Sequence, residues 1–62
     1  MKAQMMKAAR MLKGVTQHDL AESVGCTEAL ISKIETGRAV PAPELKKHIA
    51  RVLEIETWEV GT

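Results

Sequence analysis

The stretch from Val15 to Arg38 contains two short runs of helical periodicity separated by a glycine, and it limits the possible folds more than any other part of the chain. Thr16 can cap the first helix with Asp19 three residues later, a capping-box variant that places acidic charge at the positive end of the helix dipole. We expect this helix to run from Gln17 to about Val24. Its inner side should carry Leu20, Ala21 and Val24, and its outer side Gln17, His18, Glu22 and Ser23.

A second short helix is expected after Gly25, which interrupts the first. Thr27 is the expected N-cap, and the helix should end near Glu35 or Thr36. Two helices that meet across a short turn containing glycine form a helix-turn-helix unit, which we place at about residues 16–36. The inward-facing residues of the second helix would be Leu30, Ile31 and Ile34.

Helices are also expected on both sides of this unit. From Lys2 to Lys13 the chain is rich in residues that favour helix, and Gly14 can end that helix. Its buried stripe would be Met5 or Met6, Ala9 and Leu12. Pro43 suits the first position of a last helix spanning Glu44 to about Leu53. The apolar residues of that helix are Leu45, Ile49, Val52 and Leu53. The segment from Ile55 to Val60 is ambiguous between a last helical turn and a short extended arm.

Size and composition favour one small all-α domain over residues 1–62. With no Tyr or Phe and one Trp, the core must be aliphatic and methionine-based. The single cysteine, Cys26, excludes an internal disulfide and fits a reducing compartment. We expect Cys26 to fill a small apolar niche rather than to act as a reactive thiol. No segment approaches the ~20 apolar residues that cross a bilayer, so we expect a cytoplasmic protein with no membrane partner.

No group of residues in the sequence suggests catalysis. His18 and His48 are far apart, no nucleophile is paired with a base, and no cluster has the spacing of metal ligands. We therefore expect no enzymatic activity, no metal and no cofactor. His18 is interpreted as a solvent-facing helix residue, with a place beside a phosphate as the alternative.

The charge is unevenly distributed along the chain. All nine Lys and Arg residues fall between Lys2 and Arg51, where five acids oppose them, so this part carries a net charge of +4. The last segment holds Glu54, Glu56 and Glu59 and is −3. Such a distribution is compatible with one face that meets phosphate and another that faces away.

The chain resembles the Cro/C1-type (Xre-type) helix-turn-helix family of prokaryotic and phage transcription regulators. The resemblance covers about Met6 to Leu53. The matching residues are Ala9-Arg10, Gly14-Val15-Thr16-Gln17, Leu20-Ala21, Val24-Gly25-Cys26-Thr27, Ile31-Ser32-Lys33-Ile34-Glu35, Gly37-Arg38 and Pro41. The resemblance implies a compact four- or five-helix lambda-repressor-like domain that binds an operator in double-stranded DNA through the helix beginning at Thr27.

The same resemblance implies which residues touch DNA. Contacts to base edges would come from Thr27, Glu28, Ala29, Ser32 and Lys33. Contacts to phosphates would come from Gln17, Thr27, Arg38, Lys13 and Lys7. Glu28 has two open interpretations, because its carboxylate can accept from cytosine N4 or can simply stabilise the helix dipole.

The resemblance further implies a structural ion pair and a dimer. Arg10 and Glu35 match a family pair that joins the first helix to the end of the DNA-reading helix. A homodimer would use the C-terminal segment, residues 54–62, with Trp58 as a rigid apolar anchor. The candidate contact residues are Leu53, Ile55, Trp58 and Val60. The expected function is transcriptional regulation, as a repressor. The alternative is a protein-interaction module of the same fold, such as an antitoxin or regulatory subunit, that binds DNA weakly or not at all.

Overall fold

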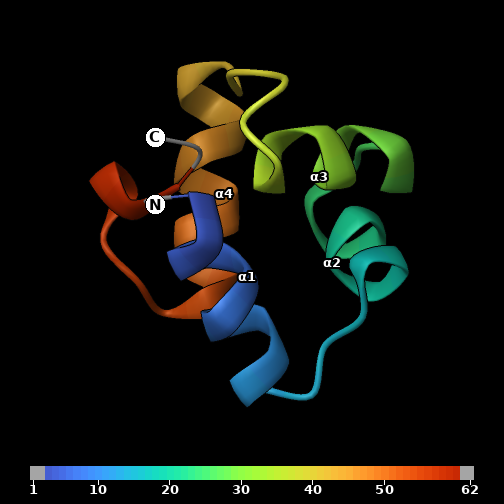
Figure 1. Ribbon diagram of the computed structural model, residues 1–62, viewed down its shortest axis with the longest axis vertical. Helices are drawn as coiled ribbons and strands as arrows, with labels where there is room; N and C mark the ends of the chain where they lie inside the picture. The colour runs from blue at the N-terminus through green and yellow to red at the C-terminus, as the bar shows by residue number, and fades with distance from the viewer. Residues whose placement is uncertain (1–2, 61–62) are drawn as a thin grey trace.

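A computed structural model of the chain describes residues 3–60, and over this range it is helical with no strand (Figure 1). The elements, in chain order, are α1 (Ala3–Leu12), α2 (Gln17–Val24), α3 (Glu28–Glu35), α4 (Pro43–Leu53) and a 3₁₀ turn, η1 (Thr57–Glu59). The expected all-α fold with a central helix-turn-helix is confirmed. None of the helices within residues 3–60 is long and apolar enough to span a membrane.

Local capping chemistry explains the bounds of α2 and α3. The Asp19 N–H donates to Thr16 Oγ1 at 3.0 Å, and the Thr16 N–H donates to the Asp19 carboxylate at 3.3 Å, which completes the expected capping box. Gly25 has a φ of 78°, a left-handed conformation that turns the chain sharply after α2 and that residues with a Cβ adopt at a cost. Thr27 Oγ1 then accepts from the Leu30 N–H at 3.1 Å and caps α3.

The end of α4 is stopped by a residue other than glycine. Pro43 occupies the first turn as expected, since its ring presets a helical φ and its missing N–H is not needed there. At the other end Glu54 has a φ of 57°. Within residues 3–60 it is the only residue other than glycine that has a positive φ. The segment after it, ambiguous from sequence, forms η1.

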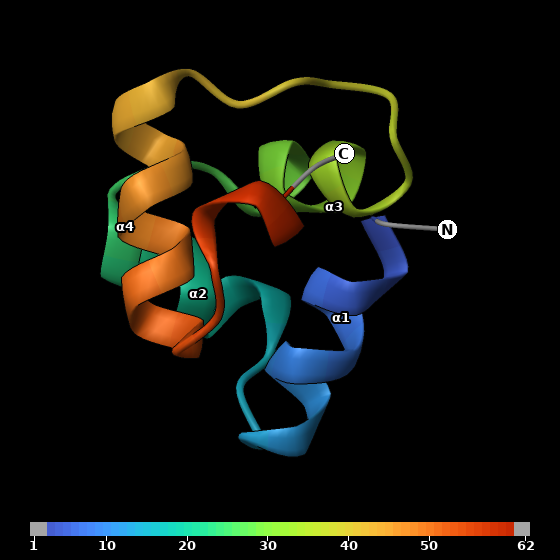
Figure 2. The ribbon, with the colours of Figure 1, turned by 90° about the vertical axis from the view of Figure 1, so that its left-hand side faces the viewer.

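One apolar core joins all four helices and the C-terminal segment. Its buried members are Met6, Leu20, Ala21, Ile31, Ile34, Ile49, Ala50, Leu53 and Val60. Figure 2 shows η1 lying between α4 and the beginning of α1, so the C-terminal segment closes the side of the core away from α2. The short α2 and α3 owe their stability to this packing, because helices of this length are marginal on their own.

The expected buried stripe of α1 is partly wrong. Met6 is buried, but Leu12 is 89% exposed. Four residues after Met6 the inward position is occupied by Arg10, which is buried at 8% exposure. The inner side of α1 therefore runs through Met6 and Arg10, and Leu12 lies outside it. The predicted start of this helix at Lys2 lies outside the described residues.

The predicted set of dimer contacts also needs correction. Leu53 is 2% exposed and Val60 is 0% exposed, because both pack into the core of this chain. Neither is available to a second subunit in this conformation. Trp58 is 58% exposed and Ile55 is half-buried, so only these two of the four candidates retain accessible surface.

Candidate functional site

Helix α3 has an exposed, mainly polar outer side and a fully buried apolar inner side. Glu28, Ala29 and Lys33 are exposed and Ser32 is half-buried, at helix positions that follow one side of α3. Thr27, the N-cap, is also exposed. The opposite side of the same helix carries Ile31 and Ile34, both at 0% exposure. The core thus fixes α3 in place while its outer side chains remain free to meet a ligand.

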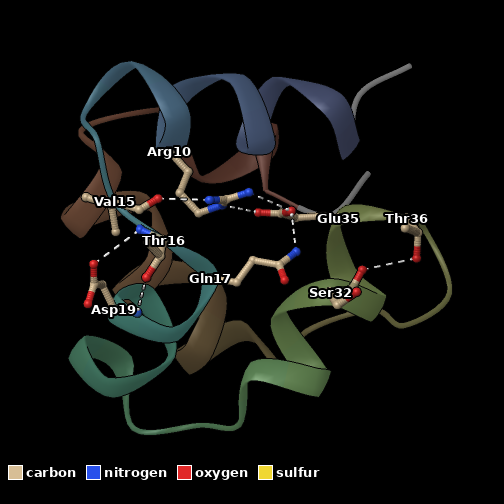
Figure 3. Close-up of polar contacts among 8 residues, drawn as sticks. All are labelled: Arg10, Val15, Thr16, Gln17, Asp19, Ser32, Glu35 and Thr36. Carbon is tan, nitrogen blue, oxygen red and sulfur yellow. Dashed lines mark hydrogen bonds and ion pairs between the residues drawn. The ribbon is translucent and has the colours of Figure 1, made fainter.

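A buried ion pair ties α3 to α1. Arg10 Nε donates to Glu35 Oε2 at 2.7 Å, and Nη2 donates to Oε1 at 3.3 Å. Arg10 Nη1 also donates to the Val15 carbonyl at 2.8 Å, so all three sides of the guanidinium are used (Figure 3). Among residues 3–60 every buried side-chain nitrogen or oxygen has a partner. The end of α3 is therefore anchored to the loop before α2 as well as to α1.

Gln17 is placed differently from the sequence prediction. It was expected on the outer side of α2, but it is half-buried, and its Nε2 donates to Glu35 Oε1 at 3.0 Å (Figure 3). The reason is that Glu35 still has acceptor capacity after binding Arg10. Gln17 thereby joins the first turn of α2 to the last turn of α3.

The beginnings of α2 and α3 lie together. His18, 64% exposed in its side chain, has Nε2 3.7 Å from Glu22 and Nδ1 3.8 Å from Glu28. Glu28 is the first residue of α3, so the imidazole connects the positive ends of two helix dipoles. This contact between α2 and α3 had no signal in the sequence beyond the helical spacing of His18 and Glu22.

The basic candidates divide into free and paired side chains. Lys33, Arg38 and Lys7 are exposed, and no acidic group of the described chain lies within 4.0 Å of them. Lys13 Nζ lies 3.3 Å from Glu54 Oε1, which ties the end of α1 to the end of α4. Arg38 is held close to α3, since its N–H donates to the Lys33 carbonyl at 2.8 Å.

No group of three or more His, Cys, Asp or Glu side chains in residues 3–60 is arranged to hold a metal ion. Cys26 is half-buried against the core, where its thiol lies 3.5 Å from the Thr27 carbonyl. Burial raises the pKa of this thiol above its ordinary value, which suits the apolar niche expected from sequence.

Comparison with known proteins agrees with this arrangement. A family model described as helix-turn-helix matches residues 6–57, which include α2, α3 and the whole of α4. The chain belongs to the Cro/C1-type helix-turn-helix family. Over 56 residues this family member is 33% identical to YazB of Bacillus subtilis (strain 168), an uncharacterised helix-turn-helix-type transcriptional regulator. The match covers 90% of this chain and 81% of that protein. No solved structure gives a significant match.

The first residue of α3 is acidic. Glu28 brings a carboxylate to the start of α3, and His18 lies against it. Lys33, on the same helix, forms no ion pair with Glu28. Five positions along a helix are a poor spacing for an ion pair, so the Glu28 carboxylate is not compensated from within α3.

Proposed function

We propose that the protein binds double-stranded DNA sequence-specifically, with α3 as the recognition helix in the major groove, and regulates transcription as a repressor. The observation that carries this proposal is the contrast between the two sides of α3. On its outer side Thr27, Glu28, Ala29 and Lys33 are exposed, while Ile31 and Ile34 on the opposite side are completely buried. A helix held rigidly from behind, with small and polar groups in front, suits entry into a groove that admits one helix.

Base edges would be read by the side chains on the outer side. Lys33 can donate to guanine O6 or N7, and Ala29 can contact a thymine methyl group. Ser32 and Thr27 carry hydroxyls that can donate or accept. Thr27 and Lys33 are six positions apart in the chain, so these groups would span only a few base pairs.

Phosphates would be bound at both ends of α3. At the start, unpaired N–H groups of the first turns of α2 and α3 offer donors and positive potential, with Gln17 and Thr27 at those positions. At the end, Arg38 is exposed and attached to α3 through the backbone. Lys7 and Lys13 are more distant candidates, and Lys13 would have to leave Glu54. These contacts would fix the position of α3 without reading sequence.

A homodimer would place two recognition helices on adjacent half-sites. Trp58 and Ile55 are the candidate contact residues that keep accessible surface. A large exposed aromatic side chain can supply contact area at little entropic cost. Trp58→Ser should therefore weaken dimerisation on DNA, measured as loss of cooperative binding to a two-half-site duplex, with unchanged binding to a single half-site.

A DNA-binding role would place the protein in the cytoplasm.

A salt titration tests the proposal and separates it from the interaction-module alternative. The exposed acids Glu22 and Glu28, which lie on either side of His18 near the start of α3, favour that alternative. A DNA-binding protein loses affinity as salt rises, with a log–log slope of about −0.9 for each phosphate contact. Mixed-sequence duplex should therefore bind at low salt and dissociate steeply as salt increases. Absence of binding at low salt would reject DNA binding in favour of the interaction module.

A further inference from the structure

His18 lies between a carboxylate of its own helix and a carboxylate of the recognition helix. Nε2 is 3.7 Å from Glu22 Oε2, and Nδ1 is 3.8 Å from Glu28 Oε1, so each ring nitrogen faces one acid. Both distances are too long for hydrogen bonds. The interaction is therefore electrostatic, and it is attractive when both nitrogens carry protons and the ring is positive.

No other cation serves Glu28 within the described chain. Among residues 3–60, the imidazole of His18 is the only basic group within 4.0 Å of the Glu28 or the Glu22 carboxylate. Helices α1 and α4 bring no carboxylate of the described chain within that distance of the ring. The charge state of His18 thus decides whether the carboxylate at the start of the recognition helix is compensated.

We propose that His18 is a positioning residue for DNA reading: as an imidazolium it holds the Glu28 carboxylate at the start of α3 so that this carboxylate accepts from an exocyclic amino group in the major groove. The inference rests on the proposed DNA binding and adds a specificity determinant to it. Glu28 meets His18 through Oε1 and keeps Oε2 for a base. A carboxylate can only accept, and the pairing expected from groove chemistry is cytosine N4.

Protonation of His18 also lowers the electrostatic cost of bringing Glu28 near phosphates. With a neutral ring, Glu22 and Glu28 both oppose the approach of a polyanion. With a charged ring, the three groups together carry one negative charge instead of two. Affinity and base preference should therefore both be higher when the ring is protonated than when it is neutral.

The test uses the full chain and a duplex recovered by it from a random pool, with a second duplex in which the cytosine assigned to Glu28 is replaced. Binding is measured at about pH 5.5 and about pH 7.5. For the wild type, preference for the first duplex over the second should be about two- to five-fold greater at the lower pH, the range expected for an exposed charge pair. His18→Gln should remove this pH dependence. His18→Arg should hold the low-pH preference at both pH values, because its charge is permanent.

His48→Gln is the matched control. His48 is the other histidine, exposed on α4, with no acid of the described chain within 4.0 Å, so this variant should keep the wild-type profile. Retention of the pH dependence by His18→Gln, or its loss in His48→Gln, would overturn the role of His18 while leaving DNA binding intact. Failure of the wild type to bind duplex at either pH would overturn both.

Discussion

Arg10 and Glu35 join α1 to the end of α3 through two hydrogen bonds of 2.7 and 3.3 Å, and both side chains are almost completely buried. Glu35 is the last residue of α3, so the pair holds that end of the helix against α1. Gln17, from the first turn of α2, completes it. Three of the four helices are therefore connected through one carboxylate.

Replacing one partner of this pair should cost far more than replacing both. Arg10→Met leaves the Glu35 charge buried with Gln17 as its remaining donor, and should lower the free energy of unfolding by about 3 to 5 kcal/mol. The double variant Arg10→Met with Glu35→Leu removes the unpaired charge and should be the more stable of the two variants. Urea unfolding followed by circular dichroism measures both. A double variant less stable than Arg10→Met would contradict the burial argument.

Glu54→Gly should stabilise the protein. Glu54 ends α4 with a φ of 57°, a conformation that costs a residue with a Cβ about 1 to 2 kcal/mol. Part of the gain is lost because glycine has more freedom in the unfolded chain, so the net increase should be about 1 kcal/mol. Thermal unfolding would report it as a higher Tm. Lys13→Gln is the control for the surface ion pair with Glu54, and its effect should be below about 1 kcal/mol. A lower Tm for Glu54→Gly would show that this φ carries no strain.

Cys26 should react slowly in the folded protein. Its pKa is raised by burial, so at neutral pH the fraction in the reactive thiolate form is smaller than for a free thiol. Alkylation by iodoacetamide should therefore be slower in the native protein than in urea, and should accelerate as pH rises towards the raised pKa. Equal native and unfolded rates at neutral pH would be inconsistent with a half-buried thiol of raised pKa.

Lys33 and Arg38 should affect DNA binding in different ways. Lys33→Ala should reduce affinity for the preferred site by about 1 to 3 kcal/mol and relax its sequence preference, because it removes a donor to a base edge. Arg38→Ala should weaken all sequences alike and make the salt dependence less steep by about one phosphate. Fluorescence anisotropy with preferred and mixed duplexes at several salt concentrations distinguishes them. Equal effects of the two variants would refute this division of roles.

Local chemistry made most of the fold predictable. The bounds of α2 and α3 follow from Thr16, Gly25 and Thr27, whose effects reach only three or four residues along the chain. The errors arose where residues far apart meet. Leu12 is apolar and was expected in the core, but it is exposed. The inward position is occupied by Arg10, whose partner Glu35 is 25 residues away in the chain. Val60 is buried because η1 folds back over the core, which its sequence does not reveal.

The candidate site shows the same division. The exposure of Thr27, Glu28, Ala29 and Lys33 follows from helical periodicity once Ile31 and Ile34 are assigned to the core. The inward turn of Gln17 depends instead on spare acceptor capacity at Glu35. Side chains that link two helices are decided by tertiary packing, and no single-helix pattern contains that information.

Selection of duplexes from a random pool, carried out in parallel with the wild type and Glu28→Gln, tests the central claim most directly. If the outer side of α3 reads base edges, the wild type should enrich one motif, with half-sites about 34 to 36 Å apart if it binds as a dimer. Glu28→Gln should change that motif at one position in each half-site, towards adenine, since an amide can both donate and accept. Enrichment of no motif by the wild type, or of an identical motif by both proteins, would contradict base reading from this side of the helix.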